Sequence, residues 1–229
     1  MTREPPSDPS PLPLDSAFDN KAQRPLDALW SSFAGITGRE QGRTSFAFVS
    51  SEHNSGTTTL ATCTALGLAR HLGQGVTLIE VNSFSPAMAS YLNLDPAPGI
   101  AEVLHGTAKA KEAIRNSVAG GLKVLTAGAM PPPEGRLVGQ EARTLFQQAS
   151  EGSRYVIFDC PPVIARPRGR LLLEYADWVV LVLRARSTKR HSAQAAVRLI
   201  EETGVPILGT IVNRFQSDMP FGLGAGNWR

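Results

Sequence analysis

Short apolar segments alternate with helical patterns along this chain, and this alternation constrains its fold more than any other feature. The segments predicted to be strands are 45–49, 76–79, 122–126, 155–158, 178–183 and 207–212. The segments with helical periodicity are 57–72, 100–104, 137–149, 168–175 and 192–202. Unbroken apolar strands separated by helices are typical of an α/β protein. The sequence therefore predicts a mostly parallel, doubly wound sheet with helices on both faces, whose ligands bind at the carboxyl ends of the strands.

The length of the chain limits the number of domains. With 229 residues, 42% of them hydrophobic, the chain can form one sizeable core and is short for two. We place a single domain at 26–215, where apolar side chains at helical spacing predict a first short amphipathic helix over 26–33. Residues 1–25 contain six prolines and are predicted to be a disordered arm. The glycine-rich residues 216–229 are predicted to be a flexible tail.

Composition argues against several classes of protein. A net charge of +3 and a pI near 9.1 do not indicate a nucleic-acid-binding protein, which usually carries a concentrated basic stripe. The longest uncharged apolar run, near 178–183, is far shorter than the roughly 20 residues of a spanning helix. The first residues lack the apolar core of a signal peptide. Cys63 and Cys160 have no metal-ligand spacing, so we expect reduced thiols in a cytoplasmic protein.

The loop after the first strand is the main candidate for a binding site. Residues 49–60 join a strand to a helix through small polar residues, where backbone N–H groups bind phosphate in many proteins. The usual motif ends in Gly-Lys-Ser/Thr, and here Gly56 and Thr58 fit whereas Thr57 stands in the lysine position. A charge-assisted contact is worth about 1.5–3 kcal/mol, so we expect weakened nucleotide binding. The alternative is a strand–helix turn that binds nothing.

Several motifs occur together and in a fixed order. The loop 50–59 precedes Ile79-Glu-Val-Asn-Ser-Phe-Ser-Pro86, Gly99-Ile-Ala-Glu-Val-Leu-His-Gly106 and Ile157-Phe-Asp-Cys-Pro-Pro-Val163. With Leu125–Gly128 and Gly209–Arg214, they make the chain resemble the cytoplasmic domains of bacterial tyrosine autokinases of capsule and exopolysaccharide synthesis, of the CpsD/CapB type. That family is part of the MinD/ParA-like P-loop class, and the similarity covers roughly 26–215. The resemblance implies a P-loop NTPase-like fold, ATP and Mg²⁺ as cofactors, and a location at the inner face of the membrane. It also implies a Wzz-like membrane polysaccharide copolymerase as partner, no nucleic acid, and possible oligomers.

The chain departs from this family where the chemistry would take place. The loop lysine is replaced by Thr57 and a loop glycine by Asn54. In the second motif, Glu80, Asn82 and Phe84 stand in place of two aspartates and an arginine. The assembly helix of the family overlays on Arg24, Asp27 and Trp30, which largely lack its arginines. The tail also contains no tyrosine, because the only tyrosines of the chain are Tyr91, Tyr155 and Tyr175.

These departures favour an accessory pseudokinase of exopolysaccharide synthesis and export, with weak or no ATP turnover. One alternative is an active tyrosine autokinase that uses a displaced lysine and a tyrosine outside the tail. A second is a MinD/ParA-like positioning ATPase, a class that normally has a further lysine early in the loop. ATP and Mg²⁺ are expected to bind weakly or not at all.

The resemblance assigns roles to individual residues. Asp159 and Glu80 are the vestigial catalytic carboxylates, and Thr58 and Asp159 are the metal ligands. The cofactor-binding residues are Ser55, Gly56, Thr57, Thr58, Thr59 and Asn213. Each has a simpler alternative: Asp159 caps nearby N–H groups, Glu80 pairs with an arginine, Thr58 is a plain first-turn residue and Asn213 ends a strand. His53, where the family has proline, is expected to be an exposed loop residue.

Two basic clusters follow the fourth and fifth predicted strands, 155–158 and 178–183. They are Arg166–Arg168–Arg170 and Arg184–Arg186–Lys189–Arg190. Such runs are usually solvated faces, and that is the main interpretation. The alternatives are contact with an anionic ligand, an acidic partner loop or the membrane surface, because both loops should open on the ligand edge of the sheet.

Overall fold

The structure is a computed structural model that describes Gly35 and residues 42–73, 75–117, 121–133, 135–165 and 167–214. The predicted arm at 1–25, the amphipathic helix at 26–33 and the tail at 216–229 lie outside the described residues. Those three predictions, and with them the domain boundaries, stay predictions.

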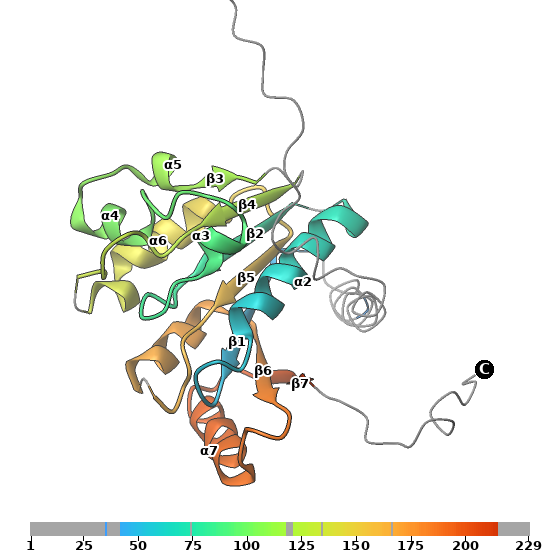
Figure 1. Cartoon of the computed structure of the whole chain (residues 1–229). Coiled ribbons are helices and arrows are strands. Elements are labelled where there is room, and N and C mark those ends of the chain that lie inside the picture. Colours follow the sequence, from blue (N-terminus) through green and yellow to red (C-terminus); the bar gives the residue numbers. More distant parts are fainter. Residues whose placement is uncertain are drawn as a thin grey trace, which may run out of the picture.

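The seven strands of the described residues form one sheet (Figure 1). They are β1 (Thr44–Ser50), β2 (Val76–Glu80), β3 (Arg115–Asn116), β4 (Leu122–Leu125), β5 (Tyr155–Asp159), β6 (Trp178–Arg184) and β7 (Ile207–Asn213). Their spatial order is β3-β4-β2-β5-β1-β6-β7. Every neighbouring pair is parallel except β3 and β4. All six predicted strands are confirmed.

Helices connect the strands, as the parallel pairing requires. They are α2 (Thr57–Leu72), α3 (Met88–Tyr91), α4 (Ile100–His105), α5 (Ala110–Ala113), α6 (Gln140–Ala149) and α7 (Arg190–Glu201), with 3₁₀ turns η2 (Arg136–Val138) and η3 (Pro167–Tyr175). The helix α2 lies between two glycines with positive φ, Gly56 and Gly73, a conformation that other residues rarely adopt. The helical pattern predicted at 137–149 corresponds to η2 followed by α6. The pattern predicted at 168–175 corresponds to the 3₁₀ segment η3.

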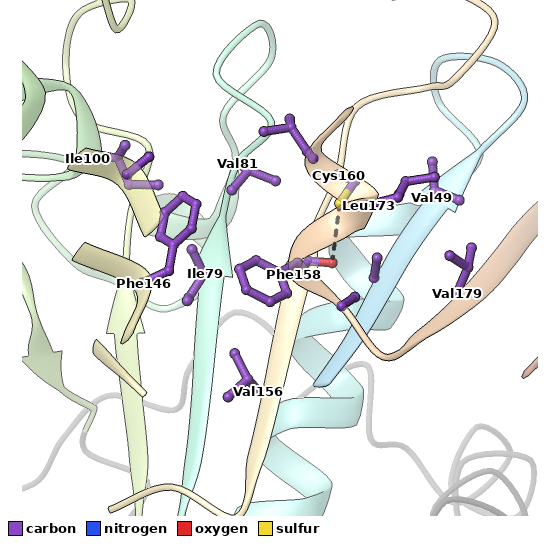
Figure 2. Close-up of a cluster of buried hydrophobic side chains, with 14 of the residues drawn as sticks. Val49, Ile79, Val81, Ile100, Phe146, Val156, Phe158, Cys160, Leu173 and Val179 are labelled. Atoms are coloured by element: carbon purple, nitrogen blue, oxygen red, sulfur yellow. Dashed lines mark hydrogen bonds between the residues drawn. The ribbon is translucent and has the colours of Figure 1, made fainter. Parts of the chain in front are cut away.

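The core lies on both faces of the sheet, because side chains of β1 alternate between them. Phe46 and Phe48 belong to the cluster under α2 and α3, whereas Ala47 and Val49 belong to the cluster under α4, α6, η3 and α7. Figure 2 shows part of the second cluster, in which the rings of Phe146 and Phe158 meet edge to face with centroids 5.6 Å apart. The doubly wound arrangement predicted from the sequence is confirmed. It places the ends of β1, β2, β5 and β7 at one edge.

Among the described residues, no helix combines the length and the apolar character needed to cross a lipid bilayer.

Candidate functional site

The loop between β1 and α2 has the shape of a phosphate-binding loop. Asn54 and Gly56 both have positive φ angles, of 59° and 87°, and these turn the chain sharply before the helix. The hydroxyls of Ser50 and Ser55 donate to the carbonyl oxygen of Glu52, at 2.8 and 2.9 Å, so the loop is fastened from inside. Ser55 is buried and its hydroxyl is used in this bond. Its side chain therefore holds the loop in shape.

The first turn of α2 presents free donors to the loop. The first intrahelical bond runs from the N–H of Leu60 to the carbonyl of Gly56, at 3.0 Å. The N–H groups of Thr57, Thr58 and Thr59 therefore have no acceptor within the helix. They lie at the positive end of the helix dipole, where an anion is stabilised. The helix has neither a side-chain cap nor an acidic residue in its first turn that would neutralise this end.

Asn213, at the end of β7, closes the other side of the loop. Its amide Nδ2 donates to the carbonyl oxygen of Ser55 at 2.9 Å, and its Oδ1 accepts from the N–H of Arg214 at 2.8 Å. A Cβ added at Gly56 would overlap this amide, so another residue there would displace the Asn213 side chain in addition to straining the φ angle. Asn213 is thus in the site, and its described contacts are with the loop backbone.

Thr58 and Asp159, which the sequence assigned to a metal site, lie in direct contact. The hydroxyl of Thr58 donates to Oδ2 of Asp159 at 2.7 Å, joining the first turn of α2 to the end of β5. Asp159 is fully buried, and its other oxygen, Oδ1, has no hydrogen-bond partner among the described residues. Burial raises the pKa of Asp159 to about 8; the Thr58 hydroxyl opposes this increase, and the nearby Glu80 carboxyl adds to it.

Glu80, at the end of β2, is bound to the backbone on two sides. Its Oε1 accepts from the N–H groups of Ala87 and Met88, at 2.7 and 2.9 Å, and its Oε2 accepts from the N–H of Ala127, at 3.2 Å. Burial raises the pKa of Glu80, and the three backbone donors oppose the increase. The described partners of this carboxylate are N–H groups rather than the arginine that the simpler interpretation of the sequence offered.

The oxygen atoms at this edge fit a hard divalent cation. Mg²⁺ prefers carboxylate, hydroxyl and amide oxygens, and Thr58 and Asp159 supply two such groups. Asn82 adds a buried Oδ1 that also lacks a partner among the described residues, and its N–H donates to the carbonyl of Asp159. When bound, Mg²⁺ would neutralise phosphate charge next to the helix end. The set contains a single acidic residue, because Asn82 carries no charge.

A cavity of about 130 Å³ opens over the loop and the first turn of α2. Its polar wall consists of hydroxyl, amide and imidazole groups, and among the described residues that line it there is neither lysine nor arginine. The lining residues are Ser50, His53, Asn54, Ser55, Gly56, Thr57, Thr58, Thr59, Asn82, Ser85, Ala87, Tyr91, Cys160 and Pro162. An anion in this cavity would be held by dipoles and hydroxyls alone.

The structure thus brings together most of the residues proposed from the sequence. The five loop and helix residues from Ser55 to Thr59 line the cavity, Asn213 is bonded to the carbonyl of Ser55, and Asp159 is bonded to Thr58. Among the lining residues that sequence reasoning did not assign to the site are Ser85 and Tyr91. The phenol oxygen of Tyr91 lies 3.4 Å from the Thr59 hydroxyl. A signal existed for Ser85, which lies inside the second motif, whereas the approach of Tyr91 depends on how α3 packs on α2.

The fold and this site define a class of protein. A strand–loop–helix with free N–H groups at an inner strand of a mostly parallel sheet, next to an acid at the end of the adjacent β5, is the arrangement of P-loop NTPase-like domains. No protein-family model matches the chain.

The homologues of the chain are bacterial tyrosine-protein kinases. It is 30% identical over 142 residues to the tyrosine-protein kinase ptk of Acinetobacter johnsonii, an alignment that covers 62% of this chain and 19% of the kinase. It is 29% identical over 142 residues to YwqD of Bacillus subtilis, covering 62% and 60% of the two chains. With CpsD of Streptococcus agalactiae it shares 26% over 170 residues, covering 73% and 74%. The chain therefore spans less than two thirds of the first two of these kinases.

Solved structures show the same fold. The chimerical protein CapA2B2 superposes with a TM-score of 0.80 at 21% identity, covering 90% of both chains. The kinase domain of Escherichia coli ETK gives 0.79 at 22%, covering 96% of this chain and 87% of the other. The septum site-determining protein MinD of Pyrococcus horikoshii, solved with Mg-ADP, gives 0.63 at 19%, covering 78% and 74%. At these identities the likeness establishes the fold alone.

Proposed function

We propose that this chain is a pseudokinase, an accessory protein of exopolysaccharide synthesis and export with weak or no ATP turnover. It acts at the inner face of the membrane with the cytoplasmic region of a polysaccharide copolymerase. The motif resemblance supports the pathway and the partner. The homology to bacterial tyrosine-protein kinases supports the inference that the site derives from a kinase site.

The observation that carries this proposal is the charge of the cavity. Transfer of a phosphoryl group depends on cations that offset the charge of the reacting phosphates. The described cavity has Thr57 in the lysine position and no other lysine or arginine in its wall. The site therefore keeps the shape that holds a phosphate but lacks the lysine that would stabilise the transition state.

Glu80 and the tyrosines support the same conclusion. Both oxygens of the Glu80 carboxylate accept hydrogen bonds from the backbone, so most of its acceptor capacity serves the framework. Of the three tyrosines, Tyr155 is buried, Tyr175 is half-buried with its phenol bonded to the carbonyls of Leu137 and Gly139, and Tyr91 lies in the cavity wall. None of them is a freely exposed phosphate acceptor.

The proposal is tested by calorimetric titration with ATP and ADP, with and without Mg²⁺. The unaltered protein and the variant Thr57→Lys are titrated under the same conditions. Restoring the cation should add a contact of about 1.5–3 kcal/mol, so affinity should rise about ten- to hundredfold. Gln148→Lys, an exposed position on α6 away from the cavity, adds the same charge and should leave affinity unchanged. The proposal fails if the unaltered protein releases phosphate from ATP at about 1 s⁻¹ or faster and Thr57→Ala abolishes that release.

An active tyrosine autokinase is the second candidate, and the intact Thr58–Asp159 pair favours it. This candidate predicts phosphotyrosine after incubation with Mg-ATP and a competent membrane partner, detected by immunoblot. Tyr91→Phe should then remove the signal, since the Tyr91 phenol is the one nearest the first turn of α2. A blank immunoblot under those conditions rules this candidate out.

A further inference from the structure

A cluster of cations covers the edge where β6 and β7 end. It consists of Arg184, Arg186, Lys189, Arg190 and Arg214, and we call it the basic edge. Arg184 lies beside Asn213 in the parallel register, which brings Arg214 next to the start of the β6–α7 loop. Arg184 is partly exposed and the other four are exposed. Figure 1 shows this loop and the end of β7 side by side at one end of the sheet.

The β6–α7 loop is a tight turn that holds these cations close together. The N–H groups of Ser187 and Thr188 both donate to the carbonyl of Arg184, at 3.2 and 2.9 Å. The Thr188 hydroxyl in turn accepts from the N–H of Arg184 at 2.9 Å, and Arg186 has a positive φ of 60°. Four like charges within seven residues are therefore kept on one ordered turn.

The described acidic residues nearest to β6 and α7 in the sequence lie far from the basic edge, and the neighbouring loop after β1 carries one acid, Glu52. No Asp or Glu occurs between Asp177 and Glu201. The acids Glu201 and Glu202 lie at the opposite end of α7, about 16 Å away along the helix, beyond a Debye length of about 8–10 Å. Glu202 is also paired with Arg170 at 2.8 Å.

The position of these cations does not serve the stability of α7. Lys189 is its N-cap residue and Arg190 its first residue, and neither provides a side-chain cap. Cations at the N-terminus of a helix are repelled by the helix dipole, which favours acids there. Their placement is explained better by an anionic partner at this edge than by the fold itself.

Exposed apolar side chains also lie along this edge of the sheet, one of them next to the cations in the register. Val212, beside Leu183 in the register, is 51% exposed. Phe84 and Ile164, on the loops after β2 and β5 at the same sheet edge, are 56% and 39% exposed. Cations mixed with exposed apolar groups are the composition of surfaces that lie on anionic bilayers.

We propose that the basic edge binds directly to the anionic surface of a lipid bilayer. Lys and Arg contact the headgroups, and the neighbouring apolar side chains lie at the interface. This goes beyond the function proposed above, in which the chain reaches the membrane only through a partner. It also does not depend on the nucleotide cavity, so the ATP titration and the lipid test can fail separately.

Vesicle co-sedimentation with the full chain tests the proposal. The probes are vesicles of phosphatidylcholine alone and vesicles with about one third phosphatidylglycerol. We expect binding only to the anionic vesicles and release when the ionic strength is raised from about 0.05 to about 0.5 M. Lys189→Glu combined with Arg190→Glu should weaken binding at least about tenfold, since each cation near the surface contributes about fivefold.

The matched control is Lys109→Glu combined with Lys111→Glu, on the exposed side of α5 at the opposite side of the sheet. It changes the net charge by the same amount and should leave most of the binding intact. Equal loss in both double variants would attribute binding to net charge alone and overturn the proposal. Failure to bind anionic vesicles would also overturn the proposal. In that case, binding of the protein to soluble polyglutamate would indicate an acidic protein partner instead.

Discussion

Asp159 makes the stability of this protein depend on pH in an unusual direction. Burial raises the pKa of its carboxyl to about 8, whereas in the unfolded chain the pKa is about 3.9. Between these two values the folded state holds one proton more than the unfolded state. Stability should therefore fall as the pH rises through this window, and it should be greatest below about pH 4 as far as this group is concerned. An aspartate that is ionised and paired in the folded state has the opposite effect.

The size of this effect follows from the window. Each pH unit within it costs about 1.4 kcal/mol of unfolding free energy, so the loss from pH 5 to pH 8 is at most about 4 kcal/mol. Asp159→Asn removes the titrating group and keeps an oxygen that can accept from Thr58. Its absolute stability will also reflect a buried amide that lacks an acceptor, so the informative quantity is the change with pH.

Urea denaturation at several pH values from 5 to 8 measures this difference. The midpoint of the unaltered protein should fall by about 1 M or more relative to that of Asp159→Asn, for slopes of about 1–3 kcal/mol/M. Glu141→Gln, whose side chain is 62% exposed, is the control and should follow the unaltered protein. Midpoints of the unaltered protein and Asp159→Asn that move in parallel over the whole range would refute the reasoning.

Two further substitutions test the loop and the core. Gly56→Ala should destabilise the protein by about 1–2 kcal/mol from its φ angle alone, as chemical denaturation can show. Asn213→Ala in the same chain should relieve the overlap with the amide but not this φ penalty, and it also removes the bond to the Ser55 carbonyl. Leu66→Ala, fully buried under the sheet, should cost about 2–5 kcal/mol in unfolding free energy, whereas Phe84→Ala at an exposed position should change the same measurement by less than about 0.5 kcal/mol.

The sequence predicts the framework of this fold well because the framework rests on local signals. The strand 45–49 and the helix 57–72 are marked by apolar runs, by periodicity and by a closing glycine, and the structure confirms both. The strand β3 was missed because two residues carry no periodicity, and it depends on its antiparallel pairing with β4.

The site was predicted as a set of positions but not as a set of contacts. Gly56 and Thr58 could be found from their spacing within one loop. The bond from Asn213 to Ser55 joins residues 158 positions apart, and the three donors to Glu80 come from two different loops. Such contacts arise from the packing of the sheet edge, which no local pattern contains.

The three bonds to Glu80 also limit which changes this edge can accept. Replacing Glu80 with aspartate would withdraw the carboxylate by one methylene, about 1.5 Å, from N–H groups that now lie 2.7–3.2 Å away. The segments before α3 and after β4 would then need to shift together, or lose their shared acceptor. Replacing Glu80 with aspartate is therefore insufficient by itself to create a catalytic carboxylate, because the Glu80 carboxylate holds the segment before α3 and the segment after β4 together.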